Sequence, residues 1–551
     1  MYNYEVKKNF VMRILAIIPA RGGSKGIPRK NIRLLNGKPL IYYSVTNALQ
    51  SKYITDVYVS SDDDEILTVA QKFGAKIYKR NNELAKDITT LDPVIYNAYK
   101  NIKEQENKEY DLIITMQPTS PLLKVDSIDN AIEKMLKNIE LDTIISAKDD
   151  THLSWRFVDG KYLPNYEKRV NRQYLTPTFT ETGGFLITRK KIISENNRIG
   201  KNVDLYILKN PESIDIDTYD DWNLCEYFLR KKKILFVVRG NSEIGLGHVY
   251  NTLTLANDIV EHDIMFLVLK DSKLAYEKIK EKNYLVKQQE KNLLKEIKEI
   301  NPDVVINDIL DTTEEYIKYL KDKNIKIINF EDLGKGAKRA DLVINAIYPE
   351  TTILPKHYFG HKYFLLRDEF IYSKQKEIFE VKNILLTFGG VDPNNYTYKV
   401  LESIYDYCQE KDIKIEIIAG FGYKNYDSLK VFKNINILKN ITNISDYMLK
   451  ADIIFTSAGR TIYEVASIAT PTIVLAQNRR ELTHFFASEE NGFLNLGLGY
   501  ELSSKDILEQ FTTLVENRET REYMNKLMKE TSLKDGRKRV KQLIFNLIEE
   551  K

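Results

Sequence analysis

The sequence predicts an α/β protein built from several mostly parallel sheets. Three observations carry this prediction. Apolar runs begin at Ile14, Ile234 and Asn383, and each of them breaks into a glycine-rich turn. Helical patterns follow the first two turns, and short apolar runs then alternate with helical patterns, as in βαβ units. Ligands of such sheets bind at the carboxyl ends of the strands.

The first block is expected to begin with a strand, which is followed by a glycine-rich loop and a helix. The pattern continues as alternating strands and helices. The expected strands are Ile14–Pro19, Asp56–Ser60, Leu112–Met116 and Thr143–Ser146, and the expected helices are Leu40–Ser51 and Asp63–Phe73.

The length of 551 residues allows three or four domains at roughly 100–200 residues each. A helix ends in the basic run Tyr227–Lys233, and a new strand starts at once at Ile234. The polar stretch Ser373–Val381 separates the two later blocks. We therefore expect a first domain at 1–230 and two further domains at 231–375 and 376–551.

Composition excludes several classes of protein. The net charge is only +4, from 82 basic and 78 acidic residues, which is not the footprint of a nucleic-acid binder. Cys225 and Cys408 are too few for a disulfide framework or a cysteine-rich zinc site. No apolar run reaches the roughly 18 residues of a membrane span, and the N-terminal residues lack the pattern of a signal peptide. We expect a cytoplasmic protein.

The first turn, RGGSKGIPRKN from Arg21 to Asn31, has the residues of an anion-binding loop. Its glycines allow close approach of the backbone, and its basic residues can neutralise a triphosphate. The spacing of a Walker A loop is absent. So many donors directly after a buried strand favour a phosphate-binding turn over a basic surface turn.

Two further motifs of the first block are weaker on their own. In MQPTSPL, from Met116, a polar cluster follows a strand, and a purely structural turn is the alternative. In SIDIDTYDD, Asp215 and Asp217 stand two apart in a strand-like stretch and so project to one face. Two carboxylates on one face can hold Mg²⁺ between protein and phosphates, but many such pairs are surface caps.

Together the three motifs resemble the CMP-sialic acid synthetase family, which activates nonulosonic acids with CTP. The resemblance covers about residues 13–228 and implies a nucleotidyltransferase-type sheet that needs Mg²⁺ and forms a homodimer. Arg21 is implied as a catalytic residue. The implied CTP-binding residues are Arg21, Gly22, Ser24, Lys25, Lys30, Asn31 and Arg80, the sugar-binding residues are Gln117, Thr119, Ser120 and Arg172, and the metal ligands are Asp215 and Asp217.

The chain departs from the sialic-acid pattern of that family at three positions. Leu123 stands where an arginine is common, and Thr180 and Thr182 replace a family arginine and asparagine. The resemblance places these positions near the sugar pocket. They therefore argue against N-acetylneuraminate as the substrate more than they argue against cytidylyl transfer.

The second half opens with GNSEIGLGH, in which Gly245 and Gly247 permit a tight turn. His248 then stands where a helix begins, a position that favours the neutral imidazole and suits a general base. A packed helix-start histidine is the alternative. Asn307–Asp308 and Glu331 are candidate pocket residues without an assigned role.

Two later motifs favour the functional interpretation of His248. LLTFGGVDPNN, from Leu385, is another strand followed by a glycine turn. In ADIIFTSAGRTIYE, from Ala451, a turn opens a helix whose backbone N–H groups could hold a diphosphate. Glu464 lies one turn into that helix, where it could accept ribose hydroxyls, and Asn478 ends the next apolar run.

This half resembles the two-lobed, GT-B-like architecture of MurG, a pair of Rossmann-like domains. More closely, it resembles the UDP-2,4-diacetamido-2,4,6-trideoxy-β-L-altropyranose hydrolases of pseudaminic acid synthesis, over about residues 234–545. The resemblance implies water attack without a metal or other cofactor, with His248 as the catalytic residue. The implied UDP-binding residues are Gly390, Ser457, Gly459, Thr461, Glu464 and Asn478. Gly240 and Asn241 after Arg239, and Asn251 in place of an arginine, depart from the family.

The two resemblances predict a bifunctional enzyme of bacterial nonulosonic acid biosynthesis. One half would make a CMP-nonulosonic acid of pseudaminic or legionaminic type, and the other would release UDP from a UDP-sugar. The expected partners are CTP, a nonulosonic acid and a UDP-sugar, with no nucleic acid and no membrane span, in a homodimer formed through the first half. Fold alone leaves two alternatives open, because the second half could be a glycosyltransferase or an inactive nucleotide-sugar-binding module.

Overall fold

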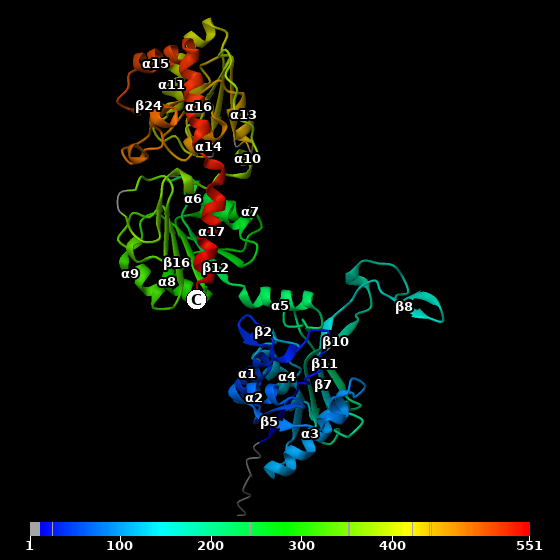
Figure 1. Ribbon diagram of the computed structural model, residues 1–551. Coiled ribbons are helices and arrows are strands. Elements are labelled where there is room, and N and C mark those ends of the chain that lie inside the picture. The colour runs from blue at the N-terminus through cyan, green and yellow to red at the C-terminus, as the bar shows by residue number, and fades with distance from the viewer. Residues whose placement is uncertain are drawn as a thin grey trace, which may run out of the picture. The chain divides into compact units, whose positions relative to one another are not determined.

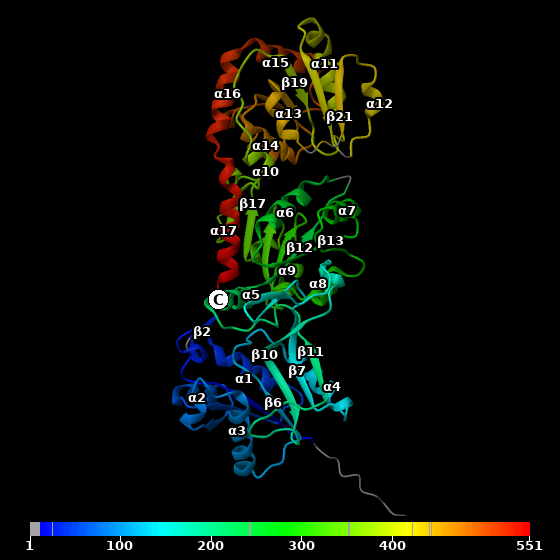
Figure 2. The ribbon, with the colours of Figure 1, turned by 90° about the vertical axis from the view of Figure 1, so that its right-hand side faces the viewer.

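The computed structural model describes residues 12–24, 26–241, 244–350, 353–420, 422–439, 441 and 443–550. The chain divides into two compact units, unit 1 (Met1–Lys231) and unit 2 (Lys232–Lys551), as Figures 1 and 2 show. Within the described residues, no helix is long and apolar enough to cross a membrane.

Unit 1 is built on a seven-stranded, mostly parallel sheet of order β11-β7-β10-β6-β1-β4-β5, which confirms the predicted fold class. Only β10 is antiparallel, and it pairs with both β6 and β7. The strands of this sheet are β1 (Ile14–Pro19), β4 (Asp56–Ser61), β5 (Lys76–Lys79), β6 (Leu112–Thr115), β7 (Thr143–Asp149), β10 (Phe179–Arg189) and β11 (Val203–Ile207).

Within the described part of unit 1, five α-helices and two short hairpins accompany this sheet. The helices begin at side-chain caps where the sequence offers them: Asp63 accepts hydrogen bonds from the backbone N–H groups of Glu65 and Ile66 at the start of α2. Thr218 and Asp221 form a capping box at the start of α5. The helices are α1 (Leu40–Gln50), α2 (Asp64–Lys72), α3 (Leu91–Glu106), α4 (Val125–Lys137) and α5 (Tyr219–Arg230), and the hairpins are β2 (Leu34–Leu35) with β3 (Lys38–Pro39) and β8 (Trp155–Val158) with β9 (Lys161–Pro164).

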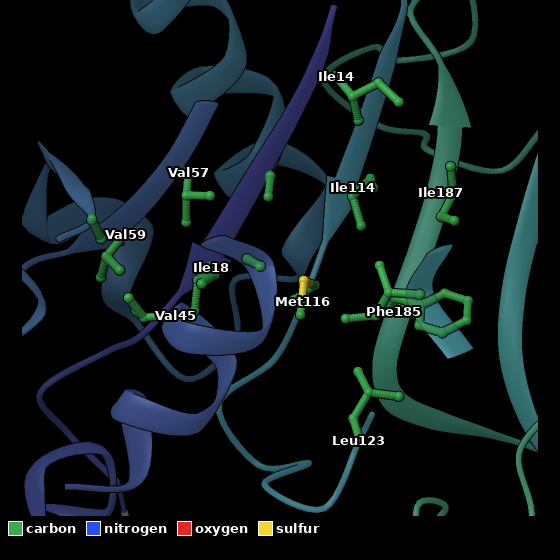
Figure 3. Packing of buried hydrophobic residues seen from close by; sticks show 14 of the residues in the cluster. Ile14, Ile18, Val45, Val57, Val59, Ile114, Met116, Leu123, Phe185 and Ile187 are labelled. Carbon is green, nitrogen blue, oxygen red and sulfur yellow. The ribbon is translucent and has the colours of Figure 1, made fainter. Parts of the chain in front are cut away.

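The largest hydrophobic core of unit 1 fixes the strand ends that carry the first site. Alternate residues of the central strands point into one face, among them Ile14 and Ile18 of β1 and Ile114 of β6 (Figure 3). Figure 3 also shows Leu123 and Phe185 packed in this cluster. Because β1 is buried along its whole length, the turn after Pro19 leaves the sheet at a fixed point.

Unit 2 contains two fully parallel sheets, which confirms the prediction of paired Rossmann-like domains. The first sheet has the order β14-β13-β12-β15-β16-β17-β18 and the second β21-β20-β19-β22-β23-β24. We call them, with their helices, the first and the second lobe. The strands are β12 (Lys233–Val238), β13 (Asp263–Val268), β14 (Val286–Gln288), β15 (Val304–Asp308), β16 (Lys326–Phe330), β17 (Leu342–Asn345), β18 (His357–Phe359), β19 (Asn383–Leu386), β20 (Lys414–Ala419), β21 (Ile435–Lys439), β22 (Ile453–Thr456), β23 (Thr472–Ala476) and β24 (Phe493–Leu498).

The last helix of the chain crosses from the second lobe back to the first. Val540, Ile544 and Leu547 of α17 belong to the core cluster of the first lobe, and Figures 1 and 2 both show α17 beside that lobe. The stretch 536–549, which follows the second lobe in sequence, therefore packs on the first. The helices of unit 2 are α6 (Gly247–Asp258), α7 (Lys273–Glu281), α8 (Leu293–Ile300), α9 (Glu314–Lys321), α10 (Asp368–Ile371), α11 (Tyr396–Glu410), α12 (Tyr426–Leu429), α13 (Ile444–Lys450), α14 (Thr461–Ile468), α15 (Ser504–Glu516), α16 (Arg518–Glu530) and α17 (Gly536–Glu549).

Candidate active sites

The glycine-rich turn of unit 1 follows β1 directly and gathers several of the predicted CTP-binding residues. Arg21 Nη1 lies 2.6 Å from Asp87 Oδ1, and its guanidinium stays partly exposed. Asn31 is buried, and its Nδ2 donates to the carbonyl oxygen of Arg21 at 2.9 Å. Ser24 lies in the same turn, whereas Lys25 lies outside the described residues.

Asp62, at the end of β4, joins the turn to the predicted residue Arg80. Its Oδ1 accepts from the backbone N–H of Gly22 and from Arg80 Nη2, both at 3.2 Å. Arg80 is only 5% exposed, and burial lowers the pKa of its guanidinium while Asp62 opposes that effect. Its Nε has no hydrogen-bond partner among the described residues, so Arg80 keeps a free donor beside the turn.

Lys30 connects the turn to the predicted metal ligands. Its Nζ donates to the carbonyl oxygen of Ile216 at 2.7 Å and lies 3.6 Å from Asp217 Oδ1. A Cβ added at Gly26 would lie 2.8 Å from the carbonyl oxygen of Asp217, so the close approach of the two segments requires glycine. The turn and the aspartates therefore form one site.

The expectation that Asp215 and Asp217 lie in a strand is wrong. They stand in an irregular segment that leads into the capping box of α5, where that cap, and not a ladder partner, fixes the backbone. Asp215 Oδ1 lies 3.4 Å from Ser120 Oγ, whereas the side chain of Asp217 is 78% exposed. Burial, followed by the negative charge of Asp217, raises the pKa of Asp215. Among the described residues, no group of three or more His, Cys, Asp or Glu side chains could hold a metal.

The polar turn Gln117–Ser120 lies between these aspartates and β10. The backbone N–H of Ile216 donates to the carbonyl oxygen of Thr119 at 2.8 Å, and that of Gln117 to Gly183 at 3.0 Å. A Cβ at Gly183 would lie 2.8 Å from Asp215 Oδ1 and 2.9 Å from Thr119 Oγ1. Thr119, a predicted sugar-binding residue, and Asp215, a predicted metal ligand, thus converge on one point of β10.

A small pocket opens beside this turn and contains an arginine that sequence reasoning missed. Arg198 is bound to Asp92 Oδ1 through Nε at 2.5 Å and to Thr115 Oγ1 through Nη1 at 3.0 Å. No motif surrounds Arg198, and its distance from Thr115 in sequence hides the contact. The pocket is lined by Leu91, Thr115, Gln117, Ile145, Glu181, Thr182, Gly183, Phe185, Leu186 and Arg198.

Arg172, the arginine that the resemblance places near the sugar, is not part of this pocket. Its Nη2 lies 3.8 Å from Asp149 Oδ2, and its side chain is 57% exposed. Of the three departures noted above, Thr182 lines the pocket and Thr180 is exposed. Leu123 is 4% exposed and belongs to the same hydrophobic cluster as Phe185, which lines the pocket, and its expected place near the sugar pocket stays a prediction.

In unit 2, His248 is held by an aspartate at the end of β15. Its Nδ1 lies 2.5 Å from Oδ1 of Asp308, whose side chain is fully buried. Asn251, one turn along α6, donates through Nδ2 to Oδ2 of the same carboxylate at 2.7 Å. When Nδ1 carries the hydrogen of this contact, Nε2 presents a lone pair. Asn251, noted above as a departure from the family, has this positioning role.

Buried polar residues at the ends of β15, β16 and β17 surround this pair. Asn307 Nδ2 donates to Asn329 Oδ1 at 2.8 Å, and Asn329 Nδ2 donates to Asp332 Oδ2 at 2.6 Å. Glu331 lies within this group and is 1% exposed. Burial raises its pKa to about 7, the charge of Asp308 adds to the effect, and Arg460 opposes it.

The predicted UDP-binding residues lie at strand ends of the second lobe. Ser457 follows β22, and a Cβ added at Gly459 would lie 3.6 Å from Ser457 Oγ. Thr461 begins α14. Gly390 lies in the turn after β19, and its carbonyl oxygen accepts from the backbone N–H of Gly422 at 2.8 Å.

Two other predicted UDP-binding residues have partners within the protein. Glu464 Oε1 lies 2.9 Å from Arg367 Nη2, and burial raises the pKa of Glu464 although Arg367 opposes the shift. Asn478 is exposed, and its Oδ1 accepts from the backbone N–H groups of Arg480 and Glu481 at 3.0 and 3.1 Å. Asn478 therefore closes a short turn in this structure.

The strand-end turn, the paired carboxylates and the mostly parallel sheet define unit 1 as a nucleotidyltransferase. The cytidylyltransferase family model matches residues 15–157. The pseudaminic acid cytidylyltransferase of Campylobacter jejuni is 36% identical over 238 residues, which is 42% of this chain and 99% of that protein. The chain therefore belongs to the cytidylyltransferase family and is an enzyme.

Two further relatives cover different shares of the chain. An uncharacterized protein of Methanocaldococcus jannaschii, MJ1062, is 35% identical over 45% of this chain, and the chain spans 56% of its length. A Helicobacter pylori protein named pseudaminic acid cytidylyltransferase and UDP-2,4-diacetamido-2,4,6-trideoxy-beta-L-altropyranose hydrolase is 24% identical over 91% of this chain and 95% of its own.

Two solved structures are similar to parts of the chain at low identity. A CMP:2-keto-3-deoxy-manno-octonic acid synthetase covers 39% of this chain and 98% of its own, at 16% identity and a TM-score of 0.31. MurG of Acinetobacter baumannii covers 57% of this chain and 99% of its own, at 14% identity and a TM-score of 0.43.

Proposed function

We propose that the chain is a bifunctional enzyme of nonulosonic acid biosynthesis. Unit 1 transfers CMP from CTP to a nonulosonic acid of pseudaminic or legionaminic type. Unit 2 hydrolyses a UDP-linked 2,4-diacetamido-2,4,6-trideoxyhexose and releases UDP. The single observation that carries this proposal is the likeness to the Helicobacter pylori protein, because it spans both units over 91% of the chain and bears both activities in its name.

The residues of unit 1 support nucleotidyl transfer. The anomeric hydroxyl of the acid attacks the α-phosphorus of CTP and loses its proton to solvent, an oxygen–phosphorus bond forms, and pyrophosphate leaves with the electrons of the broken bond. Arg21, Lys30 and Arg80 lie around one glycine turn and offset the charge of the triphosphate. Positioning and charge compensation carry most of such a reaction.

Asp215 and Asp217 suit Mg²⁺ by the chemistry of their donors. Both are oxygen ligands, the type that Mg²⁺ prefers, and Mg²⁺ completes its octahedron with waters and substrate phosphates. Burial, followed by the negative charge of Asp217, raises the pKa of Asp215, and a bound divalent cation would favour the ionised form of both carboxylates. When bound, the ion would neutralise charge on the triphosphate oxygens.

The pocket beside Gln117 supports a subsite for the acid. Arg198 brings a positive charge to its wall, and Thr182 and Glu181 bring hydrogen-bonding groups. A nonulosonic acid carries a carboxylate, for which an arginine fork is the matching partner. We assign Arg198, rather than the exposed Arg172, to this carboxylate.

The His248–Asp308 pair supports hydrolysis by unit 2. Asp308 fixes the ring, and Nε2 takes the proton of a water molecule as its oxygen attacks the sugar–diphosphate linkage. UDP leaves with the electrons of the broken bond, and the free sugar follows. Ser457, Gly459 and Thr461 lie at the start of α14, where backbone N–H groups support diphosphate binding.

We further propose a homodimer formed through unit 1, acting in the cytoplasm. Figure 1 shows the hairpin of β8 and β9 extending away from the sheet of unit 1. It exposes Trp155, Phe157 and Tyr162 at 55%, 63% and 74%, and large exposed apolar patches mark protein interfaces. The cytoplasmic assignment rests on the need for CTP and a UDP-sugar as substrates.

The test is an assay of both activities on the purified full chain. CTP turnover is measured against N-acetylneuraminate, legionaminic acid, pseudaminic acid and the eight-carbon acid Kdo, and UDP release is measured with and without a sugar acceptor. We expect pyrophosphate release with pseudaminic or legionaminic acid, and UDP release that needs no acceptor. UDP release only with an acceptor would assign unit 2 to the glycosyltransferases.

A further inference from the structure

An ion pair joins the polar site of the first lobe to the nucleotide turn of the second lobe. Arg460 Nη2 lies 3.5 Å from Glu331 Oε1. Arg460 Nη2 has no hydrogen-bond partner among the described residues, so this contact is an ion pair without a hydrogen bond. The other carboxylate oxygen, Glu331 Oε2, also lacks a hydrogen-bond partner there. Nη2 of Arg460, whose side chain is 20% exposed, and Oε2 of the buried Glu331 are thus an unused donor and an unused acceptor, an arrangement that proteins rarely keep without a function.

Glu331 occupies an unfavourable position for a structural carboxylate. It follows β16, its side chain is 1% exposed, and its backbone has a φ of +53° although it is not glycine. Strained backbone of this kind clusters at functional sites. Burial raises its pKa to about 7, with Asp308 adding to the shift. A carboxyl group with such a pKa is readily protonated near neutral pH. The loss of its partner, the guanidinium of Arg460, therefore costs it little free energy.

Arg460 stands between the two predicted functional centres of unit 2. It directly precedes Thr461, the first residue of the eight-residue helix α14, and directly follows Gly459 of the proposed diphosphate turn. A Cβ added at Gly247, the residue before His248, would lie 3.0 Å from Arg460 Cδ. The guanidinium therefore lies beside the start of α6 and within reach of a group bridging the turn and His248.

We propose that Arg460 binds the diphosphate of the nucleotide-sugar and exchanges partners to do so. In the nucleotide-free protein it pairs with Glu331, and with nucleotide bound it pairs with the phosphate oxygens. A diphosphate offers several charged acceptors in place of one loose contact, which favours the exchange. Glu331 is then a positioning residue: it holds Arg460 at the site, and it competes with the phosphates for the guanidinium of Arg460. This inference rests on the proposed function of unit 2.

The exchange predicts opposite effects for the two members of the pair. Arg460→Gln removes charged donors to the diphosphate and should weaken UDP binding about 10- to 100-fold. Glu331→Gln removes the competitor and should strengthen UDP binding several-fold. A structural bridge between the lobes would give a loss of binding in both variants, since each would break the same contact.

The experiment is calorimetric titration of the full-length chain with UDP, in excess CTP so that unit 1 is occupied. Arg460→Gln, Arg460→Lys and Glu331→Gln are compared with Arg339→Gln and Glu314→Gln, which break an exposed ion pair of the same unit. CTP turnover and thermal unfolding check that each variant is folded. The two control variants should bind UDP like the wild type.

Weaker binding by Arg460→Gln, partial recovery in Arg460→Lys and tighter binding by Glu331→Gln support the exchange. Weaker binding in both members of the pair, or unchanged binding by Arg460→Gln, overturns it. A wild-type chain that binds no UDP at all overturns the proposed function of unit 2 instead, so the two failures are distinguishable.

Discussion

Asp308 uses its two carboxylate oxygens for two different residues of α6, His248 Nδ1 at 2.5 Å and Asn251 Nδ2 at 2.7 Å. The amide of Asn251 fixes the plane of the carboxylate, and the carboxylate fixes the plane of the imidazole. The orientation of the imidazole is therefore fixed through Nδ1. The pair has the geometry of a general base with an orienting acid.

Replacing His248 should stop UDP release while sparing unit 1. We expect His248→Ala to lower the rate about 10²- to 10⁴-fold, the usual contribution of a positioned base. UDP release and CTP turnover are measured on the same sample. His357→Ala is the matched control, in a half-buried histidine whose ring nitrogens face the backbone oxygens of Pro355 and Ala337. A native rate of UDP release in His248→Ala would refute the hydrolase assignment.

Asp308→Asn tests whether the orientation of the imidazole matters. The amide can donate to Nδ1, which would place the ring hydrogen on Nε2 and remove the base. We expect UDP release to fall at least 10²-fold while the affinity for UDP changes little. A loss of affinity equal to the loss of rate would indicate a structural role for Asp308 instead.

Metal dependence should be confined to unit 1. Asp217→Ala removes an exposed carboxylate beside Lys30, and CTP turnover should become undetectable in Mg²⁺. UDP release should remain, including in EDTA. Asp220→Ala, a nearby exposed aspartate of α5, serves as the control and should retain CTP turnover. Equal loss of both activities in Asp217→Ala would show a folding defect.

Arg198 and Arg172 are the two candidate partners for the carboxylate of the nonulosonic acid, and steady-state kinetics can distinguish between them. Arg198→Gln should raise KM for the nonulosonic acid about 10-fold or more, with little change in KM for CTP, because Arg198 lines the pocket. Arg172→Gln should leave both constants nearly unchanged, since its side chain is 57% exposed. The reverse result would favour the arginine implied by family resemblance.

The raised pKa of Glu331 makes the stability of unit 2 depend on pH. The pKa of Glu331 is about 7 in the folded chain and 4.5 for an ordinary glutamate, so the folded chain binds more protons between these limits. Stability therefore falls as pH rises from about 4.5 to 7 and levels off above, by roughly 3 kcal/mol at most. Glu331→Gln should remove this fall.

The measurement is urea unfolding at pH 5, 6, 7 and 8, followed by circular dichroism. Tryptophan fluorescence reports unit 1 separately, because Trp155 and Trp222 both lie there. A constant difference in stability between Glu331→Gln and the wild type at all four pH values would contradict the prediction.

The fold could be predicted because strand, glycine turn and helix follow one another locally in sequence. β1 has the bounds expected from its apolar run, and α1 ends one residue earlier than expected. The segment of Asp215 and Asp217 was mistaken for a strand because its alternation of Ile and Asp has a period of two, whereas the capping box of α5 determines its conformation.

The candidate sites were predictable only where their residues share a motif. The turn at Arg21 and the helix start at His248 each carry several informative residues within one stretch. Arg198 reaches Thr115 across 83 positions, and Arg460 reaches Glu331 across 129, so each contact exists only after the chain has folded. Glu331 was recognised as a pocket residue, but its role depends on burial and on Arg460, which sequence does not show.

The position of α17 also constrains how unit 2 is made. Val540, Ile544, Leu547 and Ile548 complete a core whose other buried members lie within residues 234–365. During synthesis the ribosome translates every strand of the second lobe before it supplies these side chains. The first lobe therefore exposes an apolar groove until residues 536–549 emerge, and its folding is completed last although its sheet is translated first.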